Sequence, residues 1–561
     1  MPSLFPFIGF NFAFWVLVGL VRFISERAFT ILGVARTAFL LKAFAEKHFS
    51  YIEKTFGATG AVLGGAGAFL AFVLFYSATG ILDGTTSASS ASVYSSIVAW
   101  MFFALIAGYM AARIETLRPL RSAVYAGVFY FIFRVVIIIA SSGIPYLNLG
   151  IAFAALSFLL GLALFFSFLG GIVGGHFNTE DRRREARLTA MRLERIIPAE
   201  VAAIVPARNE EKSIAKTILS LKKVMAPENI YIGSDASTDK TVEIARALGV
   251  NVFDIQPNRG KANVLAYLID ENKLCDRYKA VMIVDADTEI APDYLEKALP
   301  LFDDTDIVAV AVHAVAKLEG VHRLNTAGLI HSYRVRFYRI FQATIRYAQT
   351  WKYLNTTPIV PGFASIYRTT ALRHISVNTP GLAIEDFNMT FELYHKKLGK
   401  VAYSPDVRGV AVDPLTLKDY YKQMKRWNLG LWQTIFHHGV WPSLFSTSLV
   451  AFLIELFFAS IFTMLLPFLI LALFIVPGNA IHAPLILGFS FFDVTLFGVA
   501  IFFIFDYLMT VLVALYEKKS ILLLDGFAFF ILRYIDAFTF LYTLPLALLT
   551  KSDGKWESPK R

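Results

Sequence analysis

The sequence predicts an α/β domain with a mostly parallel sheet, inserted between transmembrane α-helical regions. The chain of 561 residues is 56% hydrophobic and only 17% charged, which is too apolar on average for an ordinary soluble protein. Both flanks are nearly free of charge over long runs, whereas residues from about 178 to 435 have the mixed texture of a soluble domain. Within that stretch, short apolar runs alternate with helical patterns, which is typical of a sheet covered by helices on both faces.

The chain divides at the points where the proportion of polar and charged residues changes. We expect an N-terminal membrane region over residues 1–177, with about five transmembrane helices and an interfacial helix. A cytosolic domain with interfacial helices follows over 178–440, then a C-terminal membrane region over 441–550 and a basic tail over 551–561.

The N-terminal region offers apolar runs of the roughly 20 residues that cross a bilayer as a helix. A further segment, 28–50, carries Arg36, Lys42 and Lys47 among apolar residues and is typical of an amphipathic helix at the interface. The first run is long for a cleaved signal peptide and lacks a basic start, so we expect it to stay as a helix. The apolar runs are 5–24, 58–82, 92–112, 123–142 and 149–174.

The placement of lysine and arginine predicts the orientation. The linker 113–121 and the segment 182–195 are basic, whereas the loop 83–92 has no positive charge. This pattern predicts an integral protein of the cell (plasma) membrane with its central domain in the cytoplasm. The same placement, together with anionic lipid, accounts for the net charge of +10, so we expect the bilayer and no nucleic acid among its partners.

The C-terminal region is expected to contain two to four transmembrane or re-entrant helices. The runs 446–476 and 491–515 are apolar and long enough for one helix to cross the bilayer outward and the next to return. The last run, 521–549, contains charged residues and a proline, which favours a broken or re-entrant helix. These are Asp525, Arg533, Asp536 and Pro545.

The central domain repeats a strand followed by a helix. The apolar run 201–207 is followed by a helical pattern through Lys223. The further strands are NIYIGSD, NVFDI and KAVMIVDAD, and the further helices lie near 241–248, 261–271 and 293–301. Ligands bind beyond the carboxyl ends of such strands, which is where Asp235, Asp285 and Asp287 fall.

Asp285 and Asp287 form a D-x-D triplet on the turn that leaves a buried strand. Two carboxylates at this spacing can hold Mg²⁺ or Mn²⁺ against a diphosphate, because both ions prefer oxygen ligands and retained water. An isolated D-x-D is more often a solvated turn, but its position after VMIV favours the metal site. The chain has no glycine-rich phosphate loop of the kinase or dinucleotide type.

Seven motifs in one order resemble the family 2 glycosyltransferases, whose catalytic domain has a GT-A-like, Rossmann-like, mostly parallel sheet. They are VPARNEE, SDASTDKT, NRGKANVLAYL, VDADTEI, GFASIYRTTAL, AIED and QMKRW. The last, a Q-x-x-R-W, resembles the membrane-embedded processive branch, which includes cellulose, chitin, hyaluronan and poly-N-acetylglucosamine synthases.

The resemblance implies a set of donor-binding residues. The uridine would be contacted by Pro206, Ala207, Arg208, Glu210 and Asp235. Lys261 would reach the pyrophosphate or sugar, Asp285 the diphosphate side of the site, and Asp287, with Asp285, the metal.

The resemblance also implies the catalytic and acceptor residues. Asp386 matches the base of the family's T-E-D motif, and Glu385 precedes it. The acceptor end would lie at Phe363, Ala364 and Ser365, with Trp427.

The motif QMKRW has two interpretations. Arg426 offers a planar fork for phosphate, Trp427 a face for a sugar ring or nucleotide, and Gln423 an amide on the same helical face. Alternatively, basic and tryptophan residues anchor an interfacial helix to lipid headgroups. The upstream motifs favour the substrate role. We expect the basic, aromatic segment 322–352 to form an amphipathic helix pair on the inner membrane surface.

The chain departs from the family pattern at several points. Ser234-Asp235 stands where the family usually has two acidic residues, and the base motif is I-E-D. The sequence has no F-x-V-T-x-K-G gating loop and no C-terminal cyclic-dinucleotide domain, which argues against a bacterial cellulose synthase proper.

These observations predict an inverting, metal-dependent glycosyltransferase that uses a UDP-sugar and extends a β-linked polysaccharide. The reaction needs a base for the incoming hydroxyl and positive charge for the departing diphosphate. The alternative is a single addition to a polyprenyl-phosphate or other lipid acceptor, and a rival of another class is a transporter whose central domain senses nucleotide. The identity of the sugar and any accessory subunit are left open.

Overall fold

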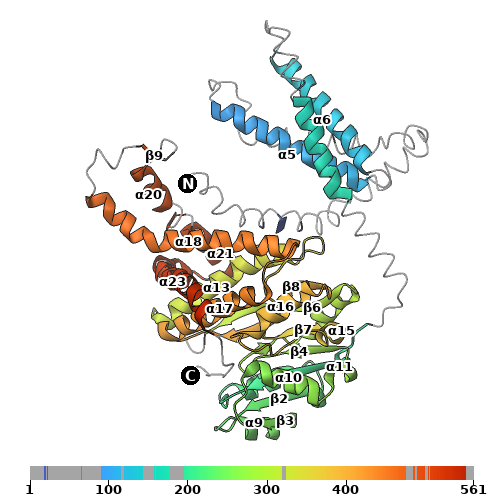
Figure 1. The fold of residues 1–561 in the computed structure, drawn as a ribbon, viewed down its shortest axis with the longest axis vertical. Helices are drawn as coiled ribbons and strands as arrows, with labels where there is room; N and C mark the ends of the chain where they lie inside the picture. Colours follow the sequence, from blue (N-terminus) through green and yellow to red (C-terminus); the bar gives the residue numbers. More distant parts are fainter. Residues whose placement is uncertain are drawn as a thin grey trace, which may run out of the picture. The chain divides into compact units, whose positions relative to one another are not determined.

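The computed structural model describes nearly all of the central domain and parts of the flanks (Figure 1). The described residues are 90–114, 119–142, 159–175, 195–318, 324–475, 484–486, 489–499, 503–504 and 506–550, with isolated positions 15, 18, 19, 22, 65 and 157. The predicted segments 28–50 and 551–561, and nearly all of 5–24, 58–82 and 182–195, lie outside them. The chain divides into two compact units, Met1–Arg22 with Leu193–Arg561 and Phe23–Arg192, and each is described by itself.

The first half of the sheet in the central domain is parallel, as predicted. Its strands lie in the order β3 (Asn251–Ile255), β2 (Ile230–Asp235), β1 (Val201–Ala207) and β4 (Ala280–Ile283). Each neighbouring pair runs in the same direction. The carboxyl ends of β2 and β4 therefore bring Asp235 and the D-x-D turn to one edge of the sheet.

The second half of the sheet is mixed, so the expectation of a mostly parallel sheet is wrong there. The order continues from β4 through β7 (Ser365–Arg368), β6 (Ile307–Lys317), β8 (Lys400–Val412) and β5 (Glu289–Ile290). β7 is antiparallel to both of its neighbours, and β5 is antiparallel to β8. A strand that is buried on both faces reads as an apolar run whichever way its neighbour points, so the sequence pattern did not reveal the direction.

Helices cover both faces of the parallel half. α8 (Ile214–Leu221) buries residues at helical spacing against one face, and α10 (Lys261–Glu271) does so against the other. Each such buried Ile or Leu contributes roughly 1.5–3 kcal/mol. Gly233 in β2 allows the close approach of α10, because a Cβ there would lie 2.5 Å from Val264 Cγ1. α9 (Thr241–Ala247) and α12 (Tyr294–Ala298) also form at the predicted positions.

The segment predicted as a helix pair is one continuous helical segment over its described part. α13 (Thr326–Ile340) passes through a π-helical turn at Phe341–Arg346 into α14 (Tyr347–Gln349). It packs on the sheet, where the amide of Gln342 bonds both backbone groups of Ala314 in β6. Its arginines are not spread on a surface, since Arg334 and Arg336 are buried.

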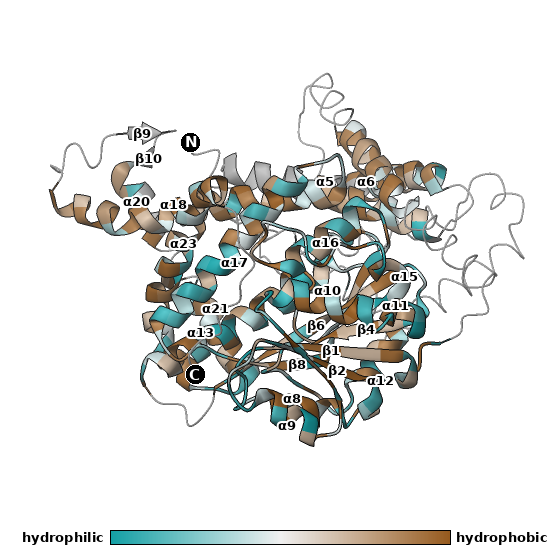
Figure 2. Cartoon of the chain, turned by 60° about the horizontal axis from the view of Figure 1, so that its bottom comes forward, coloured by the Kyte–Doolittle hydropathy of each residue, from teal (hydrophilic) through white to brown (hydrophobic). Residues whose placement is uncertain are grey.

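The C-terminal helices begin with α17 (Leu417–His438) and α18 (Leu444–Ile475). α18 matches the predicted run 446–476 and is, within the described residues, the one helix long and apolar enough to cross a membrane. Figure 2 shows it mainly hydrophobic, in contrast to the more hydrophilic α17. The predicted run 491–515 is covered in part by α20 (Phe491–Val499) and α21 (Asp506–Glu517).

The last apolar run is a broken helix, one of the two expected forms. α22 (Ile521–Asp525) ends in a 3₁₀ turn at Gly526–Ala528, and α23 (Phe529–Leu549) follows. The turn packs against α21, where a Cβ on Gly526 would lie 2.9 Å from Thr510 Cγ2. Polar contacts tie this group to α13, from Ser332 to Asp525 at 2.5 Å and from Tyr333 to Asp536 at 2.8 Å.

The second unit contains α5 (Ser90–Ile114), α6 (Pro119–Ser142) and an apolar helix at Leu159–Gly175. These helices match the predicted runs 92–112, 123–142 and part of 149–174. They meet through small residues: a Cβ on Gly108 would lie 1.8 Å from Ser167 O, and Ser167 Oγ donates to Ala123 O at 2.6 Å. Such close backbone approach is typical of helices that pack in membranes.

Candidate active site

One ammonium group joins three of the predicted motifs. Lys261 begins α10, and its Nζ lies 2.7 Å from Asp285 Oδ1 and 2.8 Å from Glu385 Oε1. Burial acts to lower the pKa of Lys261, but the two carboxylates raise it, so the group stays charged. These contacts bring together the start of α10, the end of β4 and the first turn of α16 (Glu385–His395).

Asp386 lies beside this ion pair, in the same first turn of α16. Its Oδ2 accepts from the Gly362 N–H at 3.1 Å and its Oδ1 from the Phe387 N–H at 2.8 Å. Burial, with the charge of Glu385, raises the pKa of Asp386 to about 7, although Lys261 opposes the shift. A carboxyl that titrates near neutral pH is suited to accept a proton from a substrate.

Glu385 has the opposite character. Burial acts to raise its pKa, but the charge of Lys261 and its hydrogen bond outweigh burial and lower it. Two adjacent carboxyls are thus held in different protonation states near neutral pH, one ion-paired and one free to titrate. Arg426, which is exposed on α17, lowers the pKa of Glu385 further, so its charge reaches the same site.

Asp285 and Asp287 follow β4 and fit a divalent cation. Burial raises the pKa of Asp285, Lys261 opposes this, and the charge of nearby Asp287 adds to it. The Asp285 side chain is 36% exposed, so a ligand can reach it. Mg²⁺ is commonly held by one or two carboxylates with water and substrate phosphates, and this pair offers such oxygens. No group of three His, Cys, Asp or Glu side chains among the described residues can hold a metal alone.

Asp235 is fully buried and is used within the protein. Its two carboxylate oxygens accept from the N–H groups of Arg259 at 2.6 Å and Gly260 at 2.9 Å. It thereby fixes the loop that delivers Lys261 to the site. Gly260, with φ of 83°, is the residue at which this loop turns into α10. The predicted contact of Asp235 with uridine stays a prediction.

The first motif lies where β1 leaves the sheet. Pro206 and Ala207 are enclosed in β1 beside β2, and Arg208 is half-buried at the carboxyl edge. Glu210 is buried, with its N–H donating to Thr241 Oγ1 at 2.8 Å and its carboxylate accepting from Ser213. Of these predicted nucleotide residues, Arg208 is the one whose side chain opens toward solvent at this edge.

The amide of Gln423 and the ring of Trp427 both face a buried arginine of α13. Arg334 is 2% exposed, donates to Gln423 Oε1, and lies 4.7 Å from the centroid of the Trp427 ring. The Tyr420 ring lies 5.1 Å from the same guanidinium. The residues of the Q-x-x-R-W motif therefore differ in role: Gln423 and Trp427 hold α17 against α13, while Arg426 is exposed and its charge lowers the pKa of Glu385.

The predicted acceptor residues differ in accessibility. Phe363 is half-buried, whereas Ala364 and Ser365 are fully buried as β7 begins. Ala364 adopts φ of 57°, and its carbonyl accepts from the Tyr294 hydroxyl. The acceptor prediction for this stretch thus rests on the side chain of Phe363.

Sequence reasoning missed three residues near the site. Gly362 stands in a quoted motif, and a Cβ there would lie 3.1 Å from Glu385 Oε1 and 3.3 Å from Lys261 Nζ. Arg334 was read only as part of a basic surface, and Gln433 in α17 was not singled out. A glycine directly before the acceptor motif was the one signal available in the sequence.

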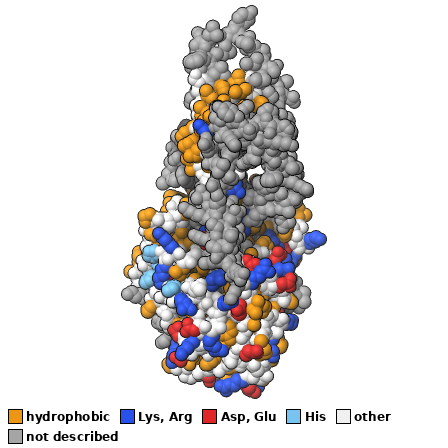
Figure 3. Space-filling model, turned by 90° about the vertical axis from the view of Figure 1, so that its right-hand side faces the viewer, with side chains coloured by type: hydrophobic (Ala, Val, Ile, Leu, Met, Phe, Trp, Pro, Cys, Tyr) orange, Lys and Arg blue, Asp and Glu red, His pale blue; other side chains and the backbone are white. Residues whose placement is uncertain are grey.

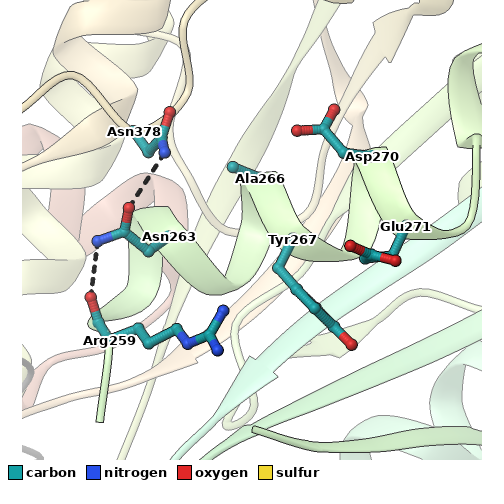
Figure 4. A pocket seen from close by; sticks show the side chains of 7 residues that line it. All are labelled: Arg259, Asn263, Ala266, Tyr267, Asp270, Glu271 and Asn378. Carbon is teal, nitrogen blue, oxygen red and sulfur yellow. Dashed lines mark hydrogen bonds between the residues drawn. The ribbon is translucent and has the colours of Figure 1, made fainter. Parts of the chain in front are cut away.

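A separate groove of about 450 Å³ runs along α10 (Figure 4). Asn263 and Asn378 are hydrogen-bonded across it at 3.1 Å, and Arg259 and Tyr267 lie beside them. The carboxylates that surround Lys261 do not line it, so we do not assign it to the same site. On the face drawn in Figure 3, side chains of both charges are interspersed over the lower part.

Comparisons with known proteins show the family to which the central domain is similar. Residues 202–376 match the family described as glycosyl transferase family 2, a span that contains Lys261, both D-x-D carboxylates and Gly362. An uncharacterized protein of Methanocaldococcus jannaschii is 31% identical over 160 residues, which are 26% of this chain and 69% of that protein. The hyaluronan synthase of Streptococcus pyogenes is 28% identical over 250 residues, which are 41% of this chain and 56% of the synthase.

The chain thus spans a little over half the length of the synthase. Among solved structures, a mannosyltransferase from Pyrobaculum calidifontis in complex with GDP-Man and Mn²⁺ aligns over 66% of this chain and 96% of that one, with 19% identity and a TM-score of 0.39. The first turn of α16 and the motif in α17 lie beyond the span that matches the family.

Proposed function

Because the chain belongs to the family 2 glycosyltransferases, we propose that it is a membrane-embedded, inverting enzyme that transfers sugar from a UDP-sugar to a growing β-linked polysaccharide and moves that polymer across the bilayer. The observation that carries the proposal is the position of Lys261 between Asp285 and Glu385, with Asp386 beside them. In this proposal Asp386 acts as the base and Lys261 as the cation at one edge of the sheet.

The reaction follows from these groups. The acceptor hydroxyl oxygen attacks the anomeric carbon from the side opposite the diphosphate, the carbon–oxygen bond to UDP breaks, and UDP leaves with the electron pair. Asp386 takes the hydroxyl proton, as its pKa of about 7 allows. One displacement inverts the anomeric centre, and no carboxylate need form a covalent intermediate.

Positive charge is required where the diphosphate departs. Lys261 and Arg426 supply it from this chain. A Mg²⁺ or Mn²⁺ ion held by Asp285 and Asp287 would neutralise the diphosphate further when bound. Lys261 could then replace one of its carboxylate partners with a phosphate oxygen of the donor, because both are anionic hydrogen-bond acceptors.

The surface of the C-terminal helices supports a bilayer location. The most apolar 18-residue window of α18 has a mean hydropathy of 2.6 and is only 11% buried, whereas a core helix of a soluble protein would be covered. Phe468, Phe474 and Ile475 are 65%, 83% and 70% exposed. Lipid is the surrounding that such a helix fits, and the small-residue packing of α5 with Leu159–Gly175 points the same way.

Product length tests the proposal against single addition to a lipid acceptor. The full chain, purified in detergent or nanodiscs, is incubated with labelled UDP-sugars and with GDP-mannose, in the presence of Mg²⁺ or Mn²⁺. UDP release with a ladder or high-mass polymer is the expected result. One lipid-linked product would replace the polymer proposal with the alternative, and no release from any donor would overturn the proposed activity.

A further inference from the structure

Helix α17 contacts the backbone directly before the Glu385–Asp386 pair. Gln433 is buried, and its Oε1 accepts from the Ala383 N–H at 2.9 Å. One turn earlier, a Cβ on Gly430 would lie 2.8 Å from Cγ1 and 2.9 Å from Cβ of Ile384. Ile384 is the residue that caps the N-terminus of α16, so both contacts act on the residues that lead into the site.

Helix α17 is also hydrogen-bonded to α23. Gln433 Nε2 donates to Thr550 O at 3.1 Å, at the end of α23. Asn428 Nδ2 donates to Thr539 Oγ1 at 3.0 Å, and Trp432 Nε1 donates to Phe540 O at 3.1 Å. One side chain, Gln433, therefore bonds both the turn that precedes the carboxylates and the last apolar helix.

We infer that Gln433 and Gly430 are positioning residues, which hold the turn Ala383–Ile384 so that Asp386 and Glu385 keep their places beside Lys261. The inference rests on the proposed function for the role of Asp386. Gln433 touches no reacting atom; it acts through the backbone of Ala383, three residues before Asp386. Gly430 acts through Ile384, which has no room to move toward α17.

The geometry makes the site sensitive to this contact. The Asp386 carboxyl is held by backbone N–H groups within 3.1 Å, and Glu385 lies 2.8 Å from Lys261. A displacement of Ile384 is transmitted to both through one or two peptide units. Misplacement of a reacting group by about 1 Å can cost about 10²-fold in rate.

Three variants of the full chain test the inference. Gln433→Leu removes both hydrogen bonds, and Gly430→Ala pushes Ile384 without changing any polar group. Trp432→Phe is the matched control, since it removes a bond from α17 to α23 but none to residues 383–386. Measurements are kcat, the donor KM, the pH dependence of kcat/KM, and hydrogen–deuterium exchange of the peptide spanning Ala383 to Phe387 without substrate.

We expect both test variants to lower kcat about 10- to 100-fold with little change in donor KM. Because Asp386 becomes less enclosed, the pKa seen on the acidic side of the kcat/KM profile should also fall. Exchange at the Ala383 amide should rise in Gln433→Leu, and the control should resemble the parent in every readout. Unchanged exchange, or a fall in kcat without movement of the pH profile, would overturn the inference. An inactive parent protein would refute the proposed function, while exchange would still decide whether Gln433 holds the turn.

Discussion

Asp386 shows how one carboxyl can be prepared for proton transfer by its surroundings. Burial and the charge of Glu385 raise its pKa, while the N–H groups of Gly362 and Phe387 fix its orientation. Lys261 keeps the neighbouring Glu385 ionised, so the pair does not share one proton symmetrically. The site thus separates a titrating group from a fixed negative charge.

Asp386→Asn should slow transfer strongly and leave donor binding intact. The amide keeps the size of the carboxyl but cannot accept the hydroxyl proton, so kcat should fall about 10²- to 10⁴-fold. UDP release and UDP-sugar binding are measured on the same preparation. Asp406→Asn, which changes an exposed carboxyl outside the site, is the control and should stay active. An Asp386→Asn protein with parental turnover would remove this residue from the mechanism.

The activity should depend on pH through Asp386. Its pKa is raised to about 7, so the ionised base is lost as the pH falls through that value. Below pH 7, kcat/KM should fall about tenfold per pH unit, and above pH 7 it should become independent of pH. We choose kcat/KM because its pH dependence reports the pKa values of the free enzyme. Rates measured from about pH 5.5 to about pH 9 test this. An acidic limb near the ordinary value of an aspartate would contradict the enclosed site.

At the scale of elements, α17 is where the site meets the C-terminal helices. It presents Gln423 and Trp427 to Arg334 of α13 and Gln433 to the turn before α16, and the charge of Arg426 acts on the pKa of Glu385. The helix is capped at its start by Thr416, whose Oγ1 accepts from the Asp419 N–H at 3.1 Å. Neighbouring residues of one motif thereby serve different purposes, since helical geometry points them to different partners.

Two arginine variants should separate these purposes. Arg334→Met leaves the Gln423 carbonyl without its donor and Trp427 without its cation, which should cost about 1–3 kcal/mol of stability. Arg426→Met changes an exposed side chain and should leave the unfolding temperature unchanged while it lowers kcat for the donor. Thermal unfolding and UDP release are measured for both. The opposite assignment, with Arg426 needed for stability and Arg334 dispensable, would refute the division.

At the scale of the whole molecule, charged groups join the sheet-bound helix α13 to the last helices. Arg336 and Arg533 both pair with Asp506 at the start of α21, and Arg339 pairs with Glu517 at its end. Charges within predicted membrane runs are therefore used, in these cases, to attach the helices to the central domain. Such pairs attach α21 to α13 at both ends of α21.

Asp506→Asn should destabilise the protein strongly. It removes the carboxylate that pairs with the buried Arg336 guanidinium, and the loss of one partner of a buried ion pair costs about 3–5 kcal/mol. The midpoint of thermal unfolding in detergent should fall accordingly. Glu296→Gln, which breaks an exposed pair with Lys297, should change it little. Equal midpoints for the two variants would show that the contact between α13 and α21 contributes no more than a surface pair.

Local features of the sequence were enough to predict the parallel half of the fold. β1 to β3 and the helices between them lie within a few residues of their predicted positions, because apolar periodicity and turn residues are set by short stretches of chain. The D-x-D turn could be found for the same reason, whereas Lys261 was implied by the resemblance to the family 2 glycosyltransferases. The run 521–549 was predicted to be broken because charged residues and Pro545 lie inside it; the break follows Asp525, whereas Pro545 is accommodated within α23.

Only the tertiary structure decided which of these residues meet. The direction of β7, the burial of Arg334, the enclosure of Ala364 and the contact of Gln433 with Ala383 all depend on residues that are 50 to 89 positions apart in the chain. The periodicity of apolar residues predicts which side chains are buried but not which residues cover them. Any partner of suitable size and polarity can bury a given side chain. The raised pKa of Asp386 has the same origin: burial by the surrounding protein and the charge of Glu385 raise it, while Lys261 and the Gly362 N–H act against the shift, and no single stretch of the chain contains all of these groups.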